Sequence, residues 1–134
     1  MPHLVILYTP NIESETDMDA LCRTLCDGML TVRDEAGKQV FPTGGTRVLA
    51  YPAAHYAVAD GKGDYAFIYM NIRMATGRSD AVKKAAGDAV LERAKAHLAP
   101  VFEKRLIGLT VQVDESPGQV YDARHSTLHP YFNR

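Results

Sequence analysis

Cysteine is scarce in this chain of 134 residues, and the two that occur, Cys22 and Cys26, cannot form a disulfide framework. They stand four residues apart without the further ligands that zinc requires. We interpret them as small apolar residues that face a core. The chain is long enough to bury such a core without disulfides or a structural metal, and its length predicts a single domain.

Charge of one sign and long apolar runs are also lacking. Fifteen basic residues balance sixteen acidic ones, which leaves a formal net charge of −1. Neither nucleic acid nor an anionic membrane is therefore expected as a partner. The apolar stretch from Leu4 to Tyr8 is far shorter than the roughly 20 residues that span a bilayer, and no Lys or Arg precedes it as in a signal peptide. We expect a soluble, cytoplasmic protein.

Several common catalytic motifs are absent too. No serine or cysteine stands in a recognisable nucleophile motif, and no dinucleotide fingerprint occurs. The segment Gly61-Lys-Gly63 is too short for a phosphate loop. His125 and His129 are four residues apart, but no acidic or cysteine partner nearby completes a metal site. These absences disfavour phosphate-loop, dinucleotide-dependent and metal-dependent enzymes, and no metal is expected.

The first half of the chain predicts a strand, a helix and a second strand. Branched apolar residues over 3–8 indicate the first strand. Apolar residues then recur with helical spacing over 17–30, and Thr16 followed by Asp19 indicates the start of this helix. The run 46–51 is typical of a strand.

The second half repeats this order of elements. A tight turn at 60–64 leads through a short hairpin into a strand over 65–73. Ser79 is a plausible cap for a long helix whose apolar stripe runs over 82–101. Alternating apolar residues over 106–113 then predict a fourth strand.

Together these elements predict an α+β fold in which duplicated β-α-β units form a four-stranded mixed sheet with two helices on one face. We divide the single domain, 1–134, into repeats of about 2–60 and 61–114 and a C-terminal tail, 115–134. The first strand carries apolar residues toward both faces, so a monomer would leave one set in water. We therefore expect a closed oligomer, with pockets shared between chains and the tail wrapped around a neighbour.

Pro2 is the most informative position for chemistry. Removal of the initiator Met1 would leave a secondary amine at the start of a buried strand. An ordinary α-amino group titrates near pH 8, and an apolar pocket with nearby cations would lower that pKa by disfavouring the charged form. A neutral ring nitrogen held on a strand can act as a general base. The alternative is that proline occupies this position by chance.

Two arginines stand at corresponding places in the two halves. Arg47 opens the second strand, and Arg78 precedes the second helix. A guanidinium can bind a carboxylate through two parallel hydrogen bonds, and the N–H groups at a helix start also attract anions. This pattern favours a small substrate with several carboxylates. The alternative is a pair of surface arginines bound to acidic residues. Arg73, on the same strand face as Tyr69, is a weaker third candidate.

Several segments together form a recognisable family pattern. They are Met1-Pro-His3, Pro10-Asn-Ile12, Phe41-Pro42, Gly45-Thr-Arg-Val48, Ala59-Asp-Gly61, and Asp64-Tyr-Ala-Phe67 through Gly77-Arg-Ser79. On these residues the sequence resembles the 5-carboxymethyl-2-hydroxymuconate isomerase family of the tautomerase superfamily over nearly its whole length. The polar stretch 33–39 looks like an insertion relative to the family, and the tail matches only loosely.

The resemblance implies a homotrimer without a cofactor, with Pro2 as acid–base catalyst and Arg47 and Arg78 as anion-binding residues. It implies conversion of a dienol acid, 5-carboxymethyl-2-hydroxymuconate, to its conjugated 2-oxo isomer in aromatic (homoprotocatechuate) catabolism. Two alternatives stay open. One is a tautomerase or hydratase with another small carboxylate substrate, and the other is a non-catalytic trimeric ligand-binding protein.

Overall fold

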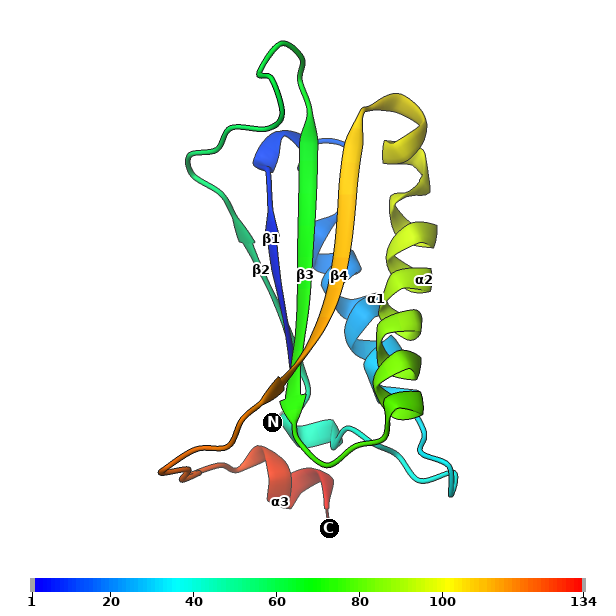
Figure 1. Cartoon of the computed structure of the whole chain (residues 1–134), viewed down its shortest axis with the longest axis vertical. Coiled ribbons are helices and arrows are strands. Elements are labelled where there is room, and N and C mark those ends of the chain that lie inside the picture. The colour runs from blue at the N-terminus through cyan, green and yellow to red at the C-terminus, as the bar shows by residue number, and fades with distance from the viewer. Residues whose placement is uncertain (1, 134) are drawn as a thin grey trace.

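A four-stranded sheet with two long helices on one face forms the body of the protein, seen in a computed structural model that describes residues 2–133 (Figure 1). The strands are β1 (His3–Tyr8), β2 (Arg47–Pro52), β3 (Ala66–Ala75) and β4 (Ile107–Ser116). The helices are α1 (Met18–Leu30), α2 (Asp80–Lys104) and the short α3 (Leu128–Phe132), with 3-10 turns η1 (Pro10–Ile12) and η2 (Thr43–Gly45).

The strand order is β2-β1-β3-β4, and the sheet is mixed as expected. β1 pairs with β2 and β3 pairs with β4 in parallel, whereas β1 and β3 are antiparallel. The predicted hairpin between the second and third strands is wrong, because β1 lies between β2 and β3. A parallel pair needs a crossover connection, so α1 carries the chain from β1 to β2, at one edge of the sheet.

Side-chain caps fix the starts of both long helices. The Asp17 carboxylate accepts a hydrogen bond from the Ala20 amide at 3.0 Å, so α1 is capped by Asp17 and not by Thr16 as predicted. The Ser79 hydroxyl accepts from the Val82 amide at 3.2 Å, which confirms the predicted cap of α2. Ser79 also donates to Glu35 of the stretch 33–39, at 2.7 Å.

The core lies between the sheet and the two long helices. Alternate residues of the central strands point into it and are completely buried, including Leu4 and Ile6 of β1 and Ile68 and Met70 of β3. Burial of each such side chain contributes about 1.5–3 kcal/mol. The helices supply Leu21, Leu25, Met29, Ala86, Val90, Ala94 and Leu98. This core fixes β1, and with it the residue that precedes β1.

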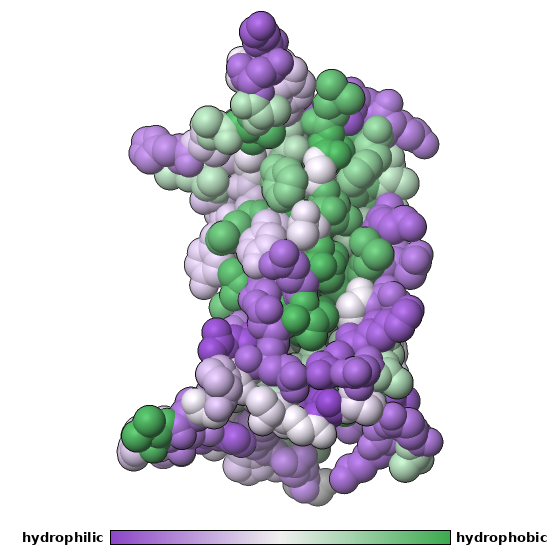
Figure 2. Space-filling view, in the orientation of Figure 1, coloured by the Kyte–Doolittle hydropathy of each residue, from purple (hydrophilic) through white to green (hydrophobic). Residues whose placement is uncertain are grey.

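The other face of the sheet is open and partly apolar. Leu7, Leu49, Tyr51 and Phe67 are between 40% and 51% exposed, and we call these four residues the apolar open face. Leu7 is in register with Tyr51, and hydrophobic residues follow the middle of this face in Figure 2. A single chain therefore leaves one apolar set of β1 and its neighbours in contact with water, as expected.

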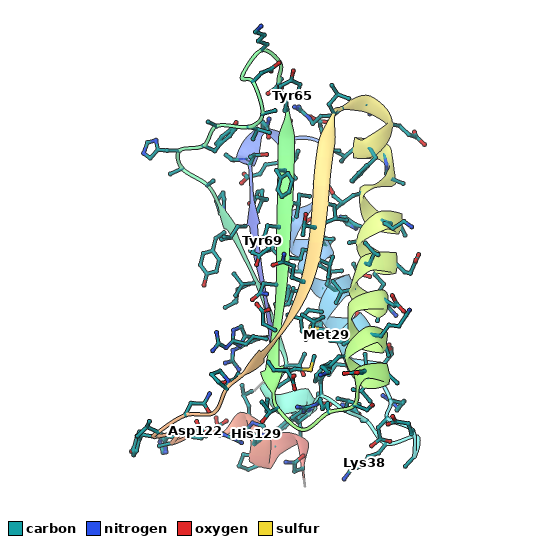
Figure 3. The ribbon with its side chains drawn as sticks, in the orientation of Figure 1. Met29, Lys38, Tyr65, Tyr69, Asp122 and His129 are labelled. Atoms are coloured by element: carbon teal, nitrogen blue, oxygen red, sulfur yellow. The ribbon has the colours of Figure 1, made fainter. Side chains whose placement is uncertain are left out.

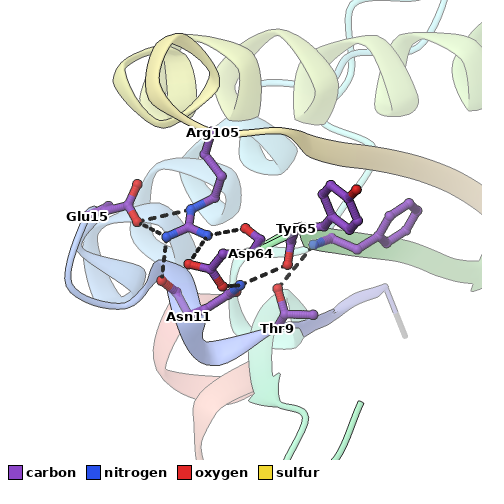
Figure 4. Close-up of polar contacts among 7 residues, drawn as sticks. Thr9, Asn11, Glu15, Asp64, Tyr65 and Arg105 are labelled. Carbon is purple, nitrogen blue, oxygen red and sulfur yellow. Dashed lines mark hydrogen bonds and ion pairs between the residues drawn. The ribbon is translucent and has the colours of Figure 1, made fainter. Parts of the chain in front are cut away.

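An arginine cluster closes one end of the sheet (Figure 4). Arg105 donates through Nε to Glu15 at 3.0 Å and pairs through Nη1 with the Asp64 carboxylate at 2.8 Å. Asn11 donates to the same carboxylate at 3.0 Å and to the carbonyl of Tyr65 at 2.8 Å. The cluster ties the start of β3 to η1 and to the end of α2.

The opposite end of the sheet gathers the N-terminus, η2, the end of β3 and the tail (Figure 1). The tail folds back on its own chain there, because α3 packs against η2. Contact of the tail with a neighbouring chain stays a prediction. Tyr121 of the tail is nevertheless 84% exposed. No helix within residues 2–133 is long and apolar enough to cross a membrane.

Candidate active site

Pro2 is buried at the end of the sheet where the tail docks. It precedes β1, which has a strand on each side and is therefore held in the middle of the sheet. Pro2 lines a cavity of about 330 Å³, which we call the Pro2 cavity. The structure thus places the sequence-predicted residue in a pocket. Removal of Met1 stays a prediction, since Met1 lies outside the described residues.

Three segments form the walls of the Pro2 cavity. Pro42, Gly44 and Gly45 come from η2 and the residue before it, and Arg47 comes from β2. The tail supplies the remaining wall, with Ala123, Arg124, His125, Ser126, Leu128 and His129. Among the described residues that line the cavity there is no carboxylate, whereas two are arginines. The cavity is therefore suited to an anion.

Arg47 lies close to Pro2 because of the strand register. β1 and β2 are parallel and pair His3 with Arg47, which puts Arg47 beside the start of β1. Its Nη1 donates to the carbonyl of Gly45 at 3.1 Å, which holds the guanidinium against η2. The structure therefore brings Pro2 and Arg47, both singled out from the sequence, into one cavity.

Arg78 lies at the same end of the sheet but does not line the Pro2 cavity. Its guanidinium carbon is 5.5 Å from the centre of the Phe41 ring, within the range of a cation–π contact. Its Nη1 donates to the carbonyl of Ala75 at 3.1 Å. Phe41 is fully buried and directly precedes Pro42, so Arg78 lies behind the cavity wall within one chain.

A second cavity, of about 180 Å³, adjoins the first, and we call it the Arg73 cavity. It contains His3 and Arg73, which are in register on β1 and β3, and it shares Arg124 with the Pro2 cavity. Asp122 also lines it, and Figure 3 shows Asp122 and His129 on the tail beyond the end of the strands. Arg73, the weaker candidate from the sequence, thus lies next to the site.

The tail residues are the part of the site that sequence reasoning missed. The sequence indicated no role for Arg124, and it led us to consider His125 and His129 only as metal ligands. The glycine pair at 44–45 carried a usable signal, because a Cβ on Gly44 would lie 3.1 Å from the His129 backbone. Glycine permits this close approach of two backbones.

The family is decided by a comparison over nearly the whole chain. The family model described as 5-carboxymethyl-2-hydroxymuconate isomerase matches residues 2–132. The chain belongs to the 5-carboxymethyl-2-hydroxymuconate isomerase family. This confirms the resemblance found in the sequence.

Individual members of this isomerase family agree with that assignment. A 5-carboxymethyl-2-hydroxymuconate Delta-isomerase of Escherichia coli is 30% identical over 133 residues, which covers 99% of this chain and 91% of the relative. A crystal structure of a 5-carboxymethyl-2-hydroxymuconate delta-isomerase is 54% identical and has a TM-score of 0.95, covering 100% of this chain and 94% of the other. The corresponding isomerase from Deinococcus radiodurans R1 is 30% identical with a TM-score of 0.84, covering 99% and 95%.

More distant structures share the fold of this isomerase family member. A fused 4-OT described as a symmetric trimer is 22% identical, with a TM-score of 0.53 over 87% of this chain and 85% of the other. At this identity the likeness shows the fold alone. The predicted tautomerase-like fold is thereby confirmed.

Proposed function

We propose that this family member is an isomerase that converts 5-carboxymethyl-2-hydroxymuconate to its conjugated 2-oxo isomer, in aromatic (homoprotocatechuate) catabolism. The family match over residues 2–132 supports the reaction class. One structural observation carries the proposal for this chain: Pro2 is buried in a cavity that contains Arg47 and, among the residues described, no carboxylate. After removal of Met1, a basic nitrogen and a cation would thus be available to one dienol acid.

In the proposed mechanism, Pro2 transfers a proton within the substrate. After removal of Met1, the neutral ring nitrogen accepts the proton of the enol hydroxyl, so an O–H bond breaks and a dienolate forms. The same nitrogen then returns the proton to a carbon of the conjugated chain, which forms a C–H bond and shifts the double bonds. Arg47 binds a carboxylate and stabilises the negative charge of the dienolate. Electrons and protons balance without a co-reactant.

Arg78 is the second anion-binding arginine of the proposal. Its stacking on Phe41 and its bond to Ala75 fix a partly exposed guanidinium at the same end of the sheet as Pro2. From there it would bind a substrate carboxylate at the rim of the site, beyond the wall that Pro42 forms.

A homotrimer is the proposed assembly. The apolar open face supports it, since association of three sheets would bury Leu7, Leu49, Tyr51 and Phe67. The symmetric trimer of the fused 4-OT is a precedent for this fold. The two cysteines are unpaired, which fits a reducing cytoplasm as the proposed location.

The test is an ultraviolet assay with 5-carboxymethyl-2-hydroxymuconate on protein whose intact mass lacks Met1. Acylation of the N-terminal nitrogen should abolish turnover, because an amide nitrogen is not a base. Pro2→Ala should lower kcat more than it raises KM, while Arg47→Gln and Arg78→Gln should raise KM as well. Arg23→Gln is a matched control, since Arg23 pairs with Asp27 on the exposed side of α1. Full activity of the acylated protein would refute the mechanism.

A panel of other enols and unsaturated acids separates the alternatives. Faster turnover of phenylpyruvate enol would indicate a tautomerase with a different substrate, and water addition to an unsaturated acid would indicate a hydratase. Retention of Met1 together with binding but no turnover would favour a ligand-binding protein.

A further inference from the structure

The Arg73 cavity combines two arginines, Arg73 and Arg124, with a single carboxylate, that of Asp122. Arg73 has no hydrogen-bond or ion-pair partner for its guanidinium within residues 2–133. Asp114, which stands opposite it on β4, instead accepts a hydrogen bond from Asn71 at 2.7 Å. An arginine that lines a cavity and whose own guanidinium has no acidic partner is available to bind an anion.

The second cation of this cavity comes from the tail. Arg124 lines both the Arg73 cavity and the Pro2 cavity, so this residue lies between them. Its only ion pair among the described residues is a long one, 3.8 Å to Asp122, and the Arg124 side chain is 59% exposed. An exposed pair at this distance contributes little and yields readily to a better anion.

The two cavities also lie side by side on the sheet. His3 follows Pro2 and is in register with Arg47 on one side and with Arg73 on the other. Residues in register point to the same face, here the open one. A ligand that passes over His3 would therefore contact the Pro2 cavity at one end and the Arg73 cavity at the other.

We propose that Arg73 and Arg124 form a separate subsite for an additional carboxylate of a tricarboxylate substrate, next to the carboxylate bound by Arg47. This inference deepens the proposed function and rests on it for the identity of the substrate. The name of that substrate specifies three carboxylates, two on the muconate chain and one on the carboxymethyl branch. The subsite selects acids with the extra carboxylate over acids that lack it.

The first test measures binding and does not depend on turnover. Tricarballylate and glutarate share a five-carbon chain and differ by one carboxylate. Calorimetry should show tighter binding of tricarballylate to the wild-type protein. Arg73→Gln and Arg124→Gln should each raise the Kd of tricarballylate about tenfold, which is the effect of one lost charge-assisted contact. The Kd of glutarate should remain nearly unchanged. Equal weakening of both acids, or no preference in the wild type, would overturn the subsite.

The second test measures the reaction, and it includes one variant that is expected to lower KM where the others raise it. Arg73→Gln and Arg124→Gln should raise KM for 5-carboxymethyl-2-hydroxymuconate but not for 2-hydroxymuconate, which lacks the branch. Asp122→Asn should lower KM for the branched acid, because it removes the carboxylate that competes for Arg124. Arg23→Gln should change neither. If the wild type isomerises neither acid, the proposed function fails, while the binding test still decides the subsite.

Discussion

The docking of the tail over Pro2 depends on Gly44, and a Gly44→Ala substitution tests it. An added Cβ would lie 3.1 Å from the Cα and N of His129 and from the carbonyl oxygen of Leu128. All three are backbone atoms, so no side-chain rotation relieves the contact. Overpacking of this kind costs about 1–3 kcal/mol.

The contacts that hold α3 in place are of similar size. Leu128, Tyr131 and Phe132 are 58%, 54% and 48% exposed, so each buries only about half of its surface. Half-burial of such a side chain contributes about 1 kcal/mol, and ordering of the tail offsets part of the total. A clash of about 1–3 kcal/mol therefore shifts the docking equilibrium by about 5- to 150-fold toward an undocked tail.

Limited trypsin digestion measures this shift, because cleavage after Arg124 requires a tail that can leave the surface. Mass spectrometry should show faster release of the fragment from 125 onward in Gly44→Ala, and KM of the isomerase should rise because Arg124 leaves both cavities. Gly87→Ala is the control: its Cβ would meet only Val113, at 3.5 Å, and alanine should stabilise α2 by about 0.5–1 kcal/mol. Unchanged cleavage and KM in Gly44→Ala would refute the reasoning.

Two further predictions concern pH. The hydrogen bond from Arg105 holds the pKa of Glu15 below its usual range. The ionised Glu15 therefore stabilises the folded state at neutral pH, and this contribution is lost as pH falls through the lowered pKa. Arg105→Met should thus lower Tm at pH 7 and converge with the wild type in acid; a constant gap would contradict this. Burial, and then the bond to Glu13, raises the pKa of Tyr8 to about 12, so its stabilisation is complete below about pH 10 and disappears as pH rises through 12. The Tm of the wild type should show this loss of stability at alkaline pH, and the Tm of Tyr8→Phe should not. Phenolate absorbance should show that Tyr8 ionises at a higher pH than an ordinary tyrosine.

Local patterns made most of the fold predictable. Runs of branched or alternating apolar residues located all four strands within a few residues, and the Ser79 cap and the helical stripe located α2. Strand neighbours were harder, because the tight turn at 60–64 suggested a hairpin while the register of β1 with β3 is a long-range contact. The cap of α1 differed by one residue, since Thr16 and Asp17 are both capping residue types.

In the site, only residues whose position is set by the strand that they begin or precede were predictable from the sequence. Pro2 and Arg47 follow from the positions of β1 and β2, which are parallel neighbours. Arg78 looked equivalent to Arg47 in the sequence, but its stacking on Phe41 depends on how a distant segment packs. Arg124 was not predictable, because it lies more than 70 residues further along the chain than Arg47 and reaches the site only when the tail docks against η2.

The placement of the arginines bears on how a substrate would lie over Pro2. Arg47 and Arg73 stand on the two strands that flank β1, so their backbones are separated by two strand spacings, about 10 Å. An acid held by both guanidinium groups would have to cross the start of β1, where Pro2 is. Its conjugated chain would then lie over the ring nitrogen, and loss of either arginine would leave the chain attached at one end only.

A double variant, Arg47→Gln with Arg73→Gln, tests this geometry. Its loss in kcat/KM, expressed as a free energy, should exceed the sum of the losses of the two single variants, because each arginine alone still tethers the substrate near the base. Strict additivity in kcat/KM would mean that the two arginines act independently of each other and do not hold one substrate across Pro2.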